Sequence, residues 1–132
     1  MFAALETAPA GTRRTLADVL DALAWNEAGL IPAIAQDHDS KAVLMLAWVN
    51  RAALEETLAT GRTCYYSRSR KRLWRKGEQS GHVQQLIKCR IDCDGDTVLF
   101  EVKQTGPACH TNRPNCFYLT VDGEDVVLSS AP

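Results

Sequence analysis

The sequence lacks any long hydrophobic run and any strong excess of charge. No stretch of its 132 residues approaches the roughly 20 apolar residues that a membrane-spanning helix needs. The start, Met1 to Glu6, has neither a basic region nor an extended apolar region, so we expect no secretory signal. The formal net charge of −1 argues against binding nucleic acid or anionic membrane through bulk charge. We therefore expect one cytoplasmic domain of ordinary composition.

The cysteines do not indicate a disulfide framework. The chain has 5 cysteines, and in a chain of intracellular type they favour free thiols and metal binding over disulfides. Cys89 falls on the apolar face of a predicted strand, and there a buried packing role is the simpler interpretation. The same interpretation suits Cys64. Three cysteines remain as candidate metal ligands.

Local patterns predict a single α+β domain over residues 15–132, preceded by a loose N-terminal extension over residues 1–14. Thr15 is a predicted N-cap for a helix that Gly29 would stop. Asn50 is a predicted N-cap for a second helix that Gly61 would end. The expected fold is a mainly antiparallel twisted sheet with these two helices flanking it. The predicted strands are 30–37, 42–49, 63–68, 73–76, 83–93, 97–103 and 116–121.

An Asp-Gly pair between two apolar runs predicts a hairpin at Asp94-Gly95. In an extended incoming strand, Ile87 would share one face with Cys89 and Ile91. The same alternation places Asp92 and Cys93 on opposite faces, which would keep two metals apart.

The hairpin turn carries three aspartates, Asp92, Asp94 and Asp96. Clustered carboxylates are suited to magnesium or calcium, and a turn at Gly95 would let the three side chains converge. The competing interpretation is a solvated hairpin tip. An EF-hand is excluded, because its loop needs glycine at position six and an acid at position twelve, where this chain has Thr97 and Lys103.

Cys93 lies within this acidic run, and Cys109 and Cys116 flank a polar loop rich in Thr, Asn and Pro. Three thiolates leave a tetrahedral zinc ion one ligand short, which is the arrangement of a hydrolytic site that keeps a position for water. The region therefore predicts a metal-dependent hydrolase.

A basic segment, residues 68–76, precedes the acidic turn and holds 6 of the 15 Lys and Arg residues of the chain. Arginine side chains and serine hydroxyls suit phosphate oxygens. The alternatives are a solvated loop and a zinc-stabilised nucleic-acid-binding module that uses the Tyr/Trp-containing segment 65–76. The acidic balance of the rest of the chain favours a small phosphorylated ligand. The candidate substrate-binding residues are Ser67, Arg68, Ser69, Arg70, Arg72, Trp74, Lys76 and Ser80.

Several motifs occur together in one order. They are Pro32 to Asp37, Val43 to Trp48, Ser67 to Arg70, Leu73 to Glu78, Ser80 to His82, Asp92 to Asp96, and Cys109-His110 with Cys116-Phe117. Over roughly residues 28–120 the chain resembles the phosphoribosyl-AMP cyclohydrolase family. Two positions depart from the family pattern, since Cys64 and Tyr66 stand where such enzymes often have His and Trp.

The resemblance implies hydrolytic opening of the adenine ring of phosphoribosyl-AMP between N1 and C6, a step of histidine biosynthesis. It implies one Zn²⁺ and one Mg²⁺ per subunit, in an intertwined homodimer with zinc ligands from both subunits. By position, Cys93, Cys109 and Cys116 match the zinc ligands. The magnesium ligands match Asp92, Asp94 and Asp96.

Residue chemistry joined to this resemblance gives a mechanistic hypothesis, in which zinc-bound hydroxide attacks C6 of the adenine ring. His110, beside Cys109, is the preferred general acid/base, because its ordinary pKa lies near neutrality. His82 is a second candidate and His38 a weaker one. A zinc deaminase is excluded, because its His-x-Glu and Pro-Cys-x-x-Cys signatures are absent.

Overall fold

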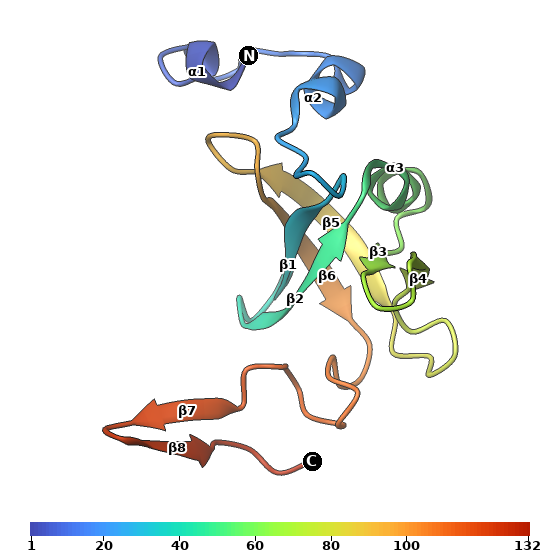
Figure 1. Ribbon diagram of the computed structural model, residues 1–132, viewed down its shortest axis with the longest axis vertical. Helices are drawn as coiled ribbons and strands as arrows, with labels where there is room; N and C mark the ends of the chain where they lie inside the picture. The colour runs from blue at the N-terminus through green and yellow to red at the C-terminus, as the bar shows by residue number, and fades with distance from the viewer.

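The computed structural model covers residues 1–132 and shows a six-stranded sheet, three helices and a separate two-stranded hairpin (Figure 1). The elements are α1 (Phe2–Leu5), α2 (Leu16–Ala22), β1 (Ile31–Asp37), β2 (Val43–Val49), α3 (Arg51–Thr60), β3 (Cys64–Ser67), β4 (Arg72–Arg75), β5 (Gln84–Ile91), β6 (Val98–Gln104), β7 (Leu119–Asp122) and β8 (Asp125–Leu128). None of the helices has the length and apolar character to cross a bilayer.

The α+β class is confirmed, but the sheet is mixed. Its strand order is β4-β3-β2-β1-β6-β5, and β1 runs parallel to β6 while every other neighbouring pair is antiparallel. Two flanking helices were predicted and three are present, since α1 lies within the segment 1–14 that was expected to be loose. The partner of β7, strand β8, was not predicted.

Helix caps follow the predicted chemistry. The Thr15 hydroxyl accepts a hydrogen bond from the N–H of Asp18 at the start of α2. The Asn50 side chain accepts one from the N–H of Ala53 at the start of α3. Gly61 ends α3 with φ 74°, the left-handed conformation that glycine adopts without steric cost.

The end of α2 was predicted wrongly. The helix stops at Ala22 instead of continuing to Gly29. The side chain of Asn26 accepts hydrogen bonds from the N–H groups of Ala28 and Leu30, both at 2.9 Å. An asparagine that binds backbone donors in this way offers the chain an alternative to further helix.

Strand β5 contains a bulge that changes which side chains face the core. Leu86 pairs with Val102 while Lys88 pairs with Glu101, so Ile87 is an extra residue in the ladder. The prediction that Ile87 shares one face of the strand with Cys89 and Ile91 is therefore wrong. Its side chain is exposed, whereas Leu86 packs against the core, as Cys89 and Ile91 do further along the strand.

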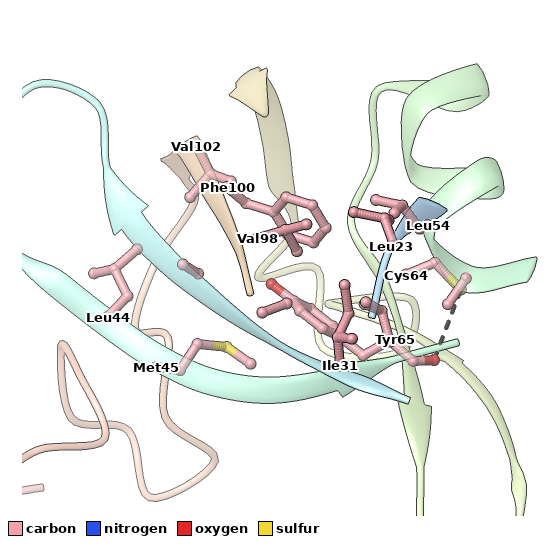
Figure 2. Packing of buried hydrophobic residues seen from close by; sticks show 14 of the residues in the cluster. Leu23, Ile31, Leu44, Met45, Leu54, Cys64, Tyr65, Val98, Phe100 and Val102 are labelled. Atoms are coloured by element: carbon pink, nitrogen blue, oxygen red, sulfur yellow. Dashed lines mark hydrogen bonds between the residues drawn. The ribbon is translucent and has the colours of Figure 1, made fainter. Parts of the chain in front are cut away.

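The hydrophobic core lies between the sheet and α3 (Figure 2), and Leu20 of α2 belongs to the same cluster. Tyr65 is its largest fully buried side chain. Its ring lies 5.9 Å from that of Phe100 and 4.9 Å from that of Trp74, centroid to centroid. These contacts fix β3 and β4, which carry the basic segment, against the strand that leads to the cysteine loop. The core thus sets the positions of the candidate site residues.

Candidate active site

The turn between β5 and β6 brings three carboxylates together. Gly95 has φ 72°, and the chain reverses there so that one carboxylate oxygen each from Asp92, Asp94 and Asp96 lies within 4.8 Å of the others. The Asp92 side chain accepts hydrogen bonds from the N–H groups of Asp96 at 3.0 Å and of Thr97 at 3.2 Å. The predicted convergence of the three side chains at a glycine turn is confirmed.

Crowding changes the acidity of these groups. Hydrogen bonding to the carboxylates of Asp92 and Asp94, together with their charges, raises the pKa of Asp96 to about 6. Partial burial opposes ionisation of Asp92, but hydrogen bonds from Asp96 and Thr97 outweigh it and lower the pKa of Asp92. Three exposed carboxylates that repel one another at this distance make a donor set suited to a hard divalent cation.

The second candidate metal-binding element is the loop that carries Cys109 and Cys116. The Cys109 thiol is buried and accepts a hydrogen bond from the Thr111 hydroxyl at 3.0 Å. The N–H of Cys109 donates to the Arg113 carbonyl, and the N–H of Cys116 donates to the Leu44 carbonyl of β2 at 2.8 Å. Backbone hydrogen bonds thus close the loop at Cys109 and join it to the sheet at Cys116.

The two thiols in this loop influence each other's ionisation, and they differ in acidity. Burial opposes ionisation of Cys109, but hydrogen bonds from Thr111 and Cys116 outweigh it and lower its pKa. Burial and the neighbouring Cys109 raise the pKa of Cys116 to about 11. The Cys109 sulfur is therefore the better placed of the two to ionise and bind a metal first.

Cys93 does not join this pair within one chain. It lies on the turn before β6, and the other two cysteines follow the far end of that strand (Figure 1). A strand as long as β6 (Val98–Gln104) spans roughly 20 Å. The three aspartates are accordingly the only group of three His, Cys, Asp or Glu side chains whose ligand atoms converge in the chain. A single chain therefore does not assemble the three thiols.

The other two cysteines fill packing positions, as the sequence indicated. Cys64 is fully buried in the core, where burial and the carboxylate of Glu56 raise the pKa of its thiol to about 12. Burial raises the pKa of the Cys89 thiol to about 11. Thiols that resist ionisation in this way are poor metal ligands.

The basic segment forms an open groove of about 500 Å³ on the surface. Of the predicted substrate-binding residues, Arg70, Arg72, Trp74 and Ser80 line it. Ser67 lies at the turn before the groove, where its hydroxyl accepts from the N–H of Arg70 at 3.2 Å.

Other basic side chains of the segment are already engaged elsewhere. The guanidinium of Arg68 lies over the ring of Trp48, 4.8 Å from its centroid. Arg75 forms a two-pronged ion pair with Glu56, at 2.7 and 2.8 Å. The charge available to a ligand in the groove is thus smaller than the sequence count indicates.

Lys76 points away from the groove and toward the cysteine loop. Its ammonium donates a hydrogen bond to the carbonyl of Ala108, the residue before Cys109. Burial lowers the pKa of Lys76, while the nearby thiols of Cys116 and Cys109 oppose that effect. The structure therefore places this lysine beside candidate metal ligands, whereas the sequence indicated a phosphate-binding position.

The three histidines lie in different surroundings. His110 is exposed on the cysteine loop. His82 is half-buried and its ring packs against Gly106, since a Cβ added at Gly106 would lie 2.6 Å from its Cδ2. His38 lies on the β1–β2 turn, 3.7 Å from the carboxylate of Glu101. Of the three, His110 and His82 adjoin the segment that carries Cys109.

A buried polar network beneath the site was not found from the sequence. The Gln84 side chain accepts hydrogen bonds from the hydroxyls of Thr63 and Tyr65, at 2.8 and 2.6 Å, and donates to Gln104 at 2.9 Å. Gln104 in turn donates to the backbone carbonyl of His82 at 3.2 Å. A glutamine beside a second glutamine in a strand gives no signal that the first is buried.

Comparison with known proteins gives one consistent family. A family model described as phosphoribosyl-AMP cyclohydrolase matches residues 45–118. The chain is 64% identical over 132 residues to a phosphoribosyl-AMP cyclohydrolase of Alkalilimnicola ehrlichii, covering 100% of this chain and 93% of the relative. It is 63% identical over 131 residues to the protein of that name from Chromohalobacter salexigens, covering 99% and 90%. It is 66% identical over 127 residues to phosphoribosyl-AMP cyclohydrolase 2 of Pseudomonas fluorescens, covering 96% and 86%.

Proposed function

The chain belongs to the phosphoribosyl-AMP cyclohydrolase family and is a hydrolase of histidine biosynthesis, and we propose that it opens the adenine ring at metal sites shared between two copies. The bond broken is N1–C6 of phosphoribosyl-AMP, and the product is the formimino aminoimidazole carboxamide ribotide. The observation that carries the proposal is the position of the cysteines. Cys109 and Cys116 lie together in the loop that follows β6, whereas Cys93 lies on the turn that precedes β6, at the opposite end of that strand.

The zinc site that we propose uses Cys109 and Cys116 of one copy and the Cys93 position of a second copy. The fit rests on the donor set, because two thiols of one loop that influence each other's ionisation match a soft, tetrahedral ion. A zinc ion held by three thiolates would lower the pKa of a coordinated water toward neutrality.

The need for a second copy is supported by the hairpin of β7 and β8. All of its strand residues are exposed, although five of them are large and apolar, and a lone two-stranded hairpin is at best marginally stable in water. The hairpin begins three residues after Cys116 and projects from the body of the chain (Figure 1). Its apolar side chains are Leu119, Val121, Val126, Val127 and Leu128. A homodimer would cover this surface.

The magnesium site that we propose is the acidic turn of Asp92, Asp94 and Asp96. Carboxylate oxygens at this spacing suit a hard cation that also contacts phosphate. The substrate carries phosphate groups, and the groove beside Arg70 and Arg72 offers guanidinium donors for them. Trp74 packs its ring against Tyr65, so its contribution to the groove is a wall held in place by the core.

Proton transfer falls to His110. Its imidazole is exposed and directly follows Cys109 in the chain, so it is the histidine nearest in sequence to the proposed zinc ligands. An imidazole there would accept a proton from the attacking water and return it to N1 as the C6–N1 bond breaks. His82 is the second candidate. Its ring packs against Gly106, so it is suited to orient the loop that carries Cys109.

The nucleic-acid-binding alternative finds less support. Arg75 is neutralised by Glu56, and Lys76 is bound to the Ala108 carbonyl, so two of the six basic side chains are not directed at a polyanion. The remaining charges suit a small phosphorylated ligand.

The test of the shared zinc site uses two inactive variants. Cys93→Ala and Cys109→Ala are each expected to lose turnover, followed as the ultraviolet change from an adenine to an imidazole carboxamide chromophore. Subunits of the two variants are then unfolded, mixed and refolded together. A mixed dimer has one intact site, so the mixture should recover about one quarter of wild-type turnover and zinc content.

Cys89→Ala is the matched control, because it removes a thiol of β5 that packs against the core. The Cys89→Ala variant should keep its zinc. When its subunits are mixed and refolded with those of Cys109→Ala, turnover should not exceed that of Cys89→Ala alone. Mixed dimers that form without any recovery would contradict a shared site. Normal turnover of either single variant would contradict the role of its thiol.

A further inference from the structure

The N-terminal segment packs against the acidic turn through one aromatic ring. Phe2 of α1 lies so close to Gly95 that a Cβ added to this glycine would stand 2.2 Å from Cε2 of the ring. On the same turn, the N–H of Ala24 donates to the carbonyl of Gly95 at 2.8 Å. Gly95 is therefore buried, whereas Asp94 and Asp96 on either side of it are exposed. The turn has a solvated side with the carboxylates and a dry side covered by Phe2.

The same segment lines an open cavity beside the candidate metal ligands. The cavity has a volume of about 320 Å³, and most of its lining is apolar. Its lining comes from α1, α2 and the end of β5, and the two helices lie at the top of Figure 1. Its lining residues are Phe2, Leu5, Glu6, Val19, Ile91, Asp92 and Cys93. The first residues of the chain thus contact the turn that carries both Asp92 and Cys93.

A converged turn of this kind needs support from its dry side. Three carboxylates within 4.8 Å of one another repel, so the turn is driven to open whenever no cation is bound. Gly95 places no side chain between the turn and the core, so packing on that side comes from elsewhere in the chain. Phe2 provides it, because its ring contacts both the turn and the hydrophobic core.

We propose that Phe2 is a positioning residue for the metal-binding turn, acting through Gly95 to keep the three carboxylates converged before a cation binds. This rests on the proposed magnesium site. In this proposal the N-terminal segment contributes to the active site by keeping the metal-binding turn in its closed conformation. Loss of the ring would leave a space behind the turn, and binding of the cation would then have to order the turn as well as occupy it.

The test compares Phe2→Ala, Phe2→Leu and Thr12→Ala in the full-length protein, without substrate. Titration with Mg²⁺ in a calorimeter should show about tenfold weaker binding for Phe2→Ala, as for other residues that orient metal ligands. Phe2→Leu should recover most of the affinity, because it refills the space with apolar volume. Thr12→Ala is the matched control, since Thr12 lies in the same segment and bonds only to the Pro9 carbonyl.

Hydrogen exchange at residues 92–97 provides a readout that does not depend on metal. In Phe2→Ala these amides should exchange faster without Mg²⁺, while those of β1 and β2 keep their wild-type rates. Unchanged exchange at the turn would overturn the proposal, as would an equal increase in every strand, which would show a general loss of stability. Wild-type Mg²⁺ affinity in Phe2→Ala would also overturn it. If the wild-type protein itself bound no Mg²⁺, the proposed magnesium site would fail, and the exchange comparison would still decide the role of Phe2.

Discussion

The carboxylate of Asp92 accepts a hydrogen bond from the backbone N–H of Asp96 at 3.0 Å, so a candidate metal ligand also closes the turn that assembles the site. Its second bond, from the N–H of Thr97, uses the same oxygen. The other Asp92 oxygen stays available to a cation. Asp92 therefore has a second role, closure of the turn, that Asp94 does not share, and substitution can separate the two roles.

Asp94→Asn is expected to weaken Mg²⁺ binding by about tenfold or more, since it removes one charged ligand and leaves the backbone of the turn unchanged. Asp92→Ala should weaken binding further, because the N–H groups of Asp96 and Thr97 also lose their acceptor. Calorimetric titration measures both affinities, and hydrogen exchange reports the turn. Equal exchange rates in the two variants would contradict the second role of Asp92.

The pH dependence of Mg²⁺ binding should follow Asp96. Because crowding by Asp92 and Asp94 raises its pKa to about 6, a proton competes with the cation below that pH. Binding is expected to be about tenfold weaker near pH 5 than near pH 7, and Asp96→Asn should lose this dependence along with much of the affinity.

The stability of the metal-free protein should also depend on the ionisation of Asp96, and the direction of this pH dependence follows from its pKa. The folded-state pKa of Asp96 lies above its ordinary value of 3.8, so its contribution to stability is fully present below pH 3.8 and is lost as the pH rises through about 6. Asp92 acts in the opposite direction, because its lowered pKa contributes stability above pH 3.8 that is lost on acidification. Thermal unfolding of Asp96→Asn near pH 8 should therefore show a higher midpoint than the metal-free wild type. A lower midpoint would contradict the repulsion.

Lys76→Met is expected to move zinc uptake to higher pH. The ammonium of Lys76 favours ionisation of Cys116, whose pKa is otherwise raised by burial and by Cys109. Zinc binds thiolates, so removal of the positive charge leaves fewer ionised at a given pH. Methionine keeps the length of the side chain, and the measurement is zinc content against pH.

The matched control for this prediction is Lys103→Met, which removes an exposed lysine of β6. It should leave zinc uptake unchanged. An identical uptake curve for Lys76→Met would show that Lys76 acts elsewhere, for example on phosphate, as its sequence context indicates.

Local interactions made much of the fold predictable from the sequence. The caps at Thr15, Asn50 and Gly61 depend on contacts within a few residues, and the Asp-Gly signal alone predicted a turn that gathers the aspartates. The packing role of Cys89 followed from its place on the apolar face of a predicted strand. In each of these cases the deciding partner lies close by in the chain.

Features set by distant partners were not predictable in this way. The parallel pairing of β1 with β6 joins Ala33 to Val98, and no local pattern specifies it. The bulge at Ile87 depends on where β5 must meet β6, and it reversed the expected face of that residue. Lys76 was assigned to phosphate from its basic neighbours, whereas its partner, the carbonyl of Ala108, follows 32 residues later.

The buried network around Gln84 should contribute to stability and to the position of His82. Gln84→Leu keeps the approximate size of the side chain but leaves the hydroxyls of Thr63 and Tyr65 without their acceptor. Unsatisfied buried hydroxyls cost about 1–3 kcal/mol each, so the free energy of unfolding should fall by about 2–6 kcal/mol in a urea titration. Gln104 would also lose its partner, and the His82 carbonyl that it binds would become less fixed.

Gln85→Leu is the control, because it makes the same chemical change at the exposed neighbouring position of β5. Its free energy of unfolding should differ from that of the wild type by no more than is usual for surface substitutions, about 0.5 kcal/mol. Because Gln84 lies beneath the site and not in it, the Gln84→Leu variant should keep its zinc while its turnover falls through displacement of His82. Wild-type turnover in a destabilised Gln84→Leu variant would show that the position of His82 does not limit the reaction, which would favour His110 for proton transfer.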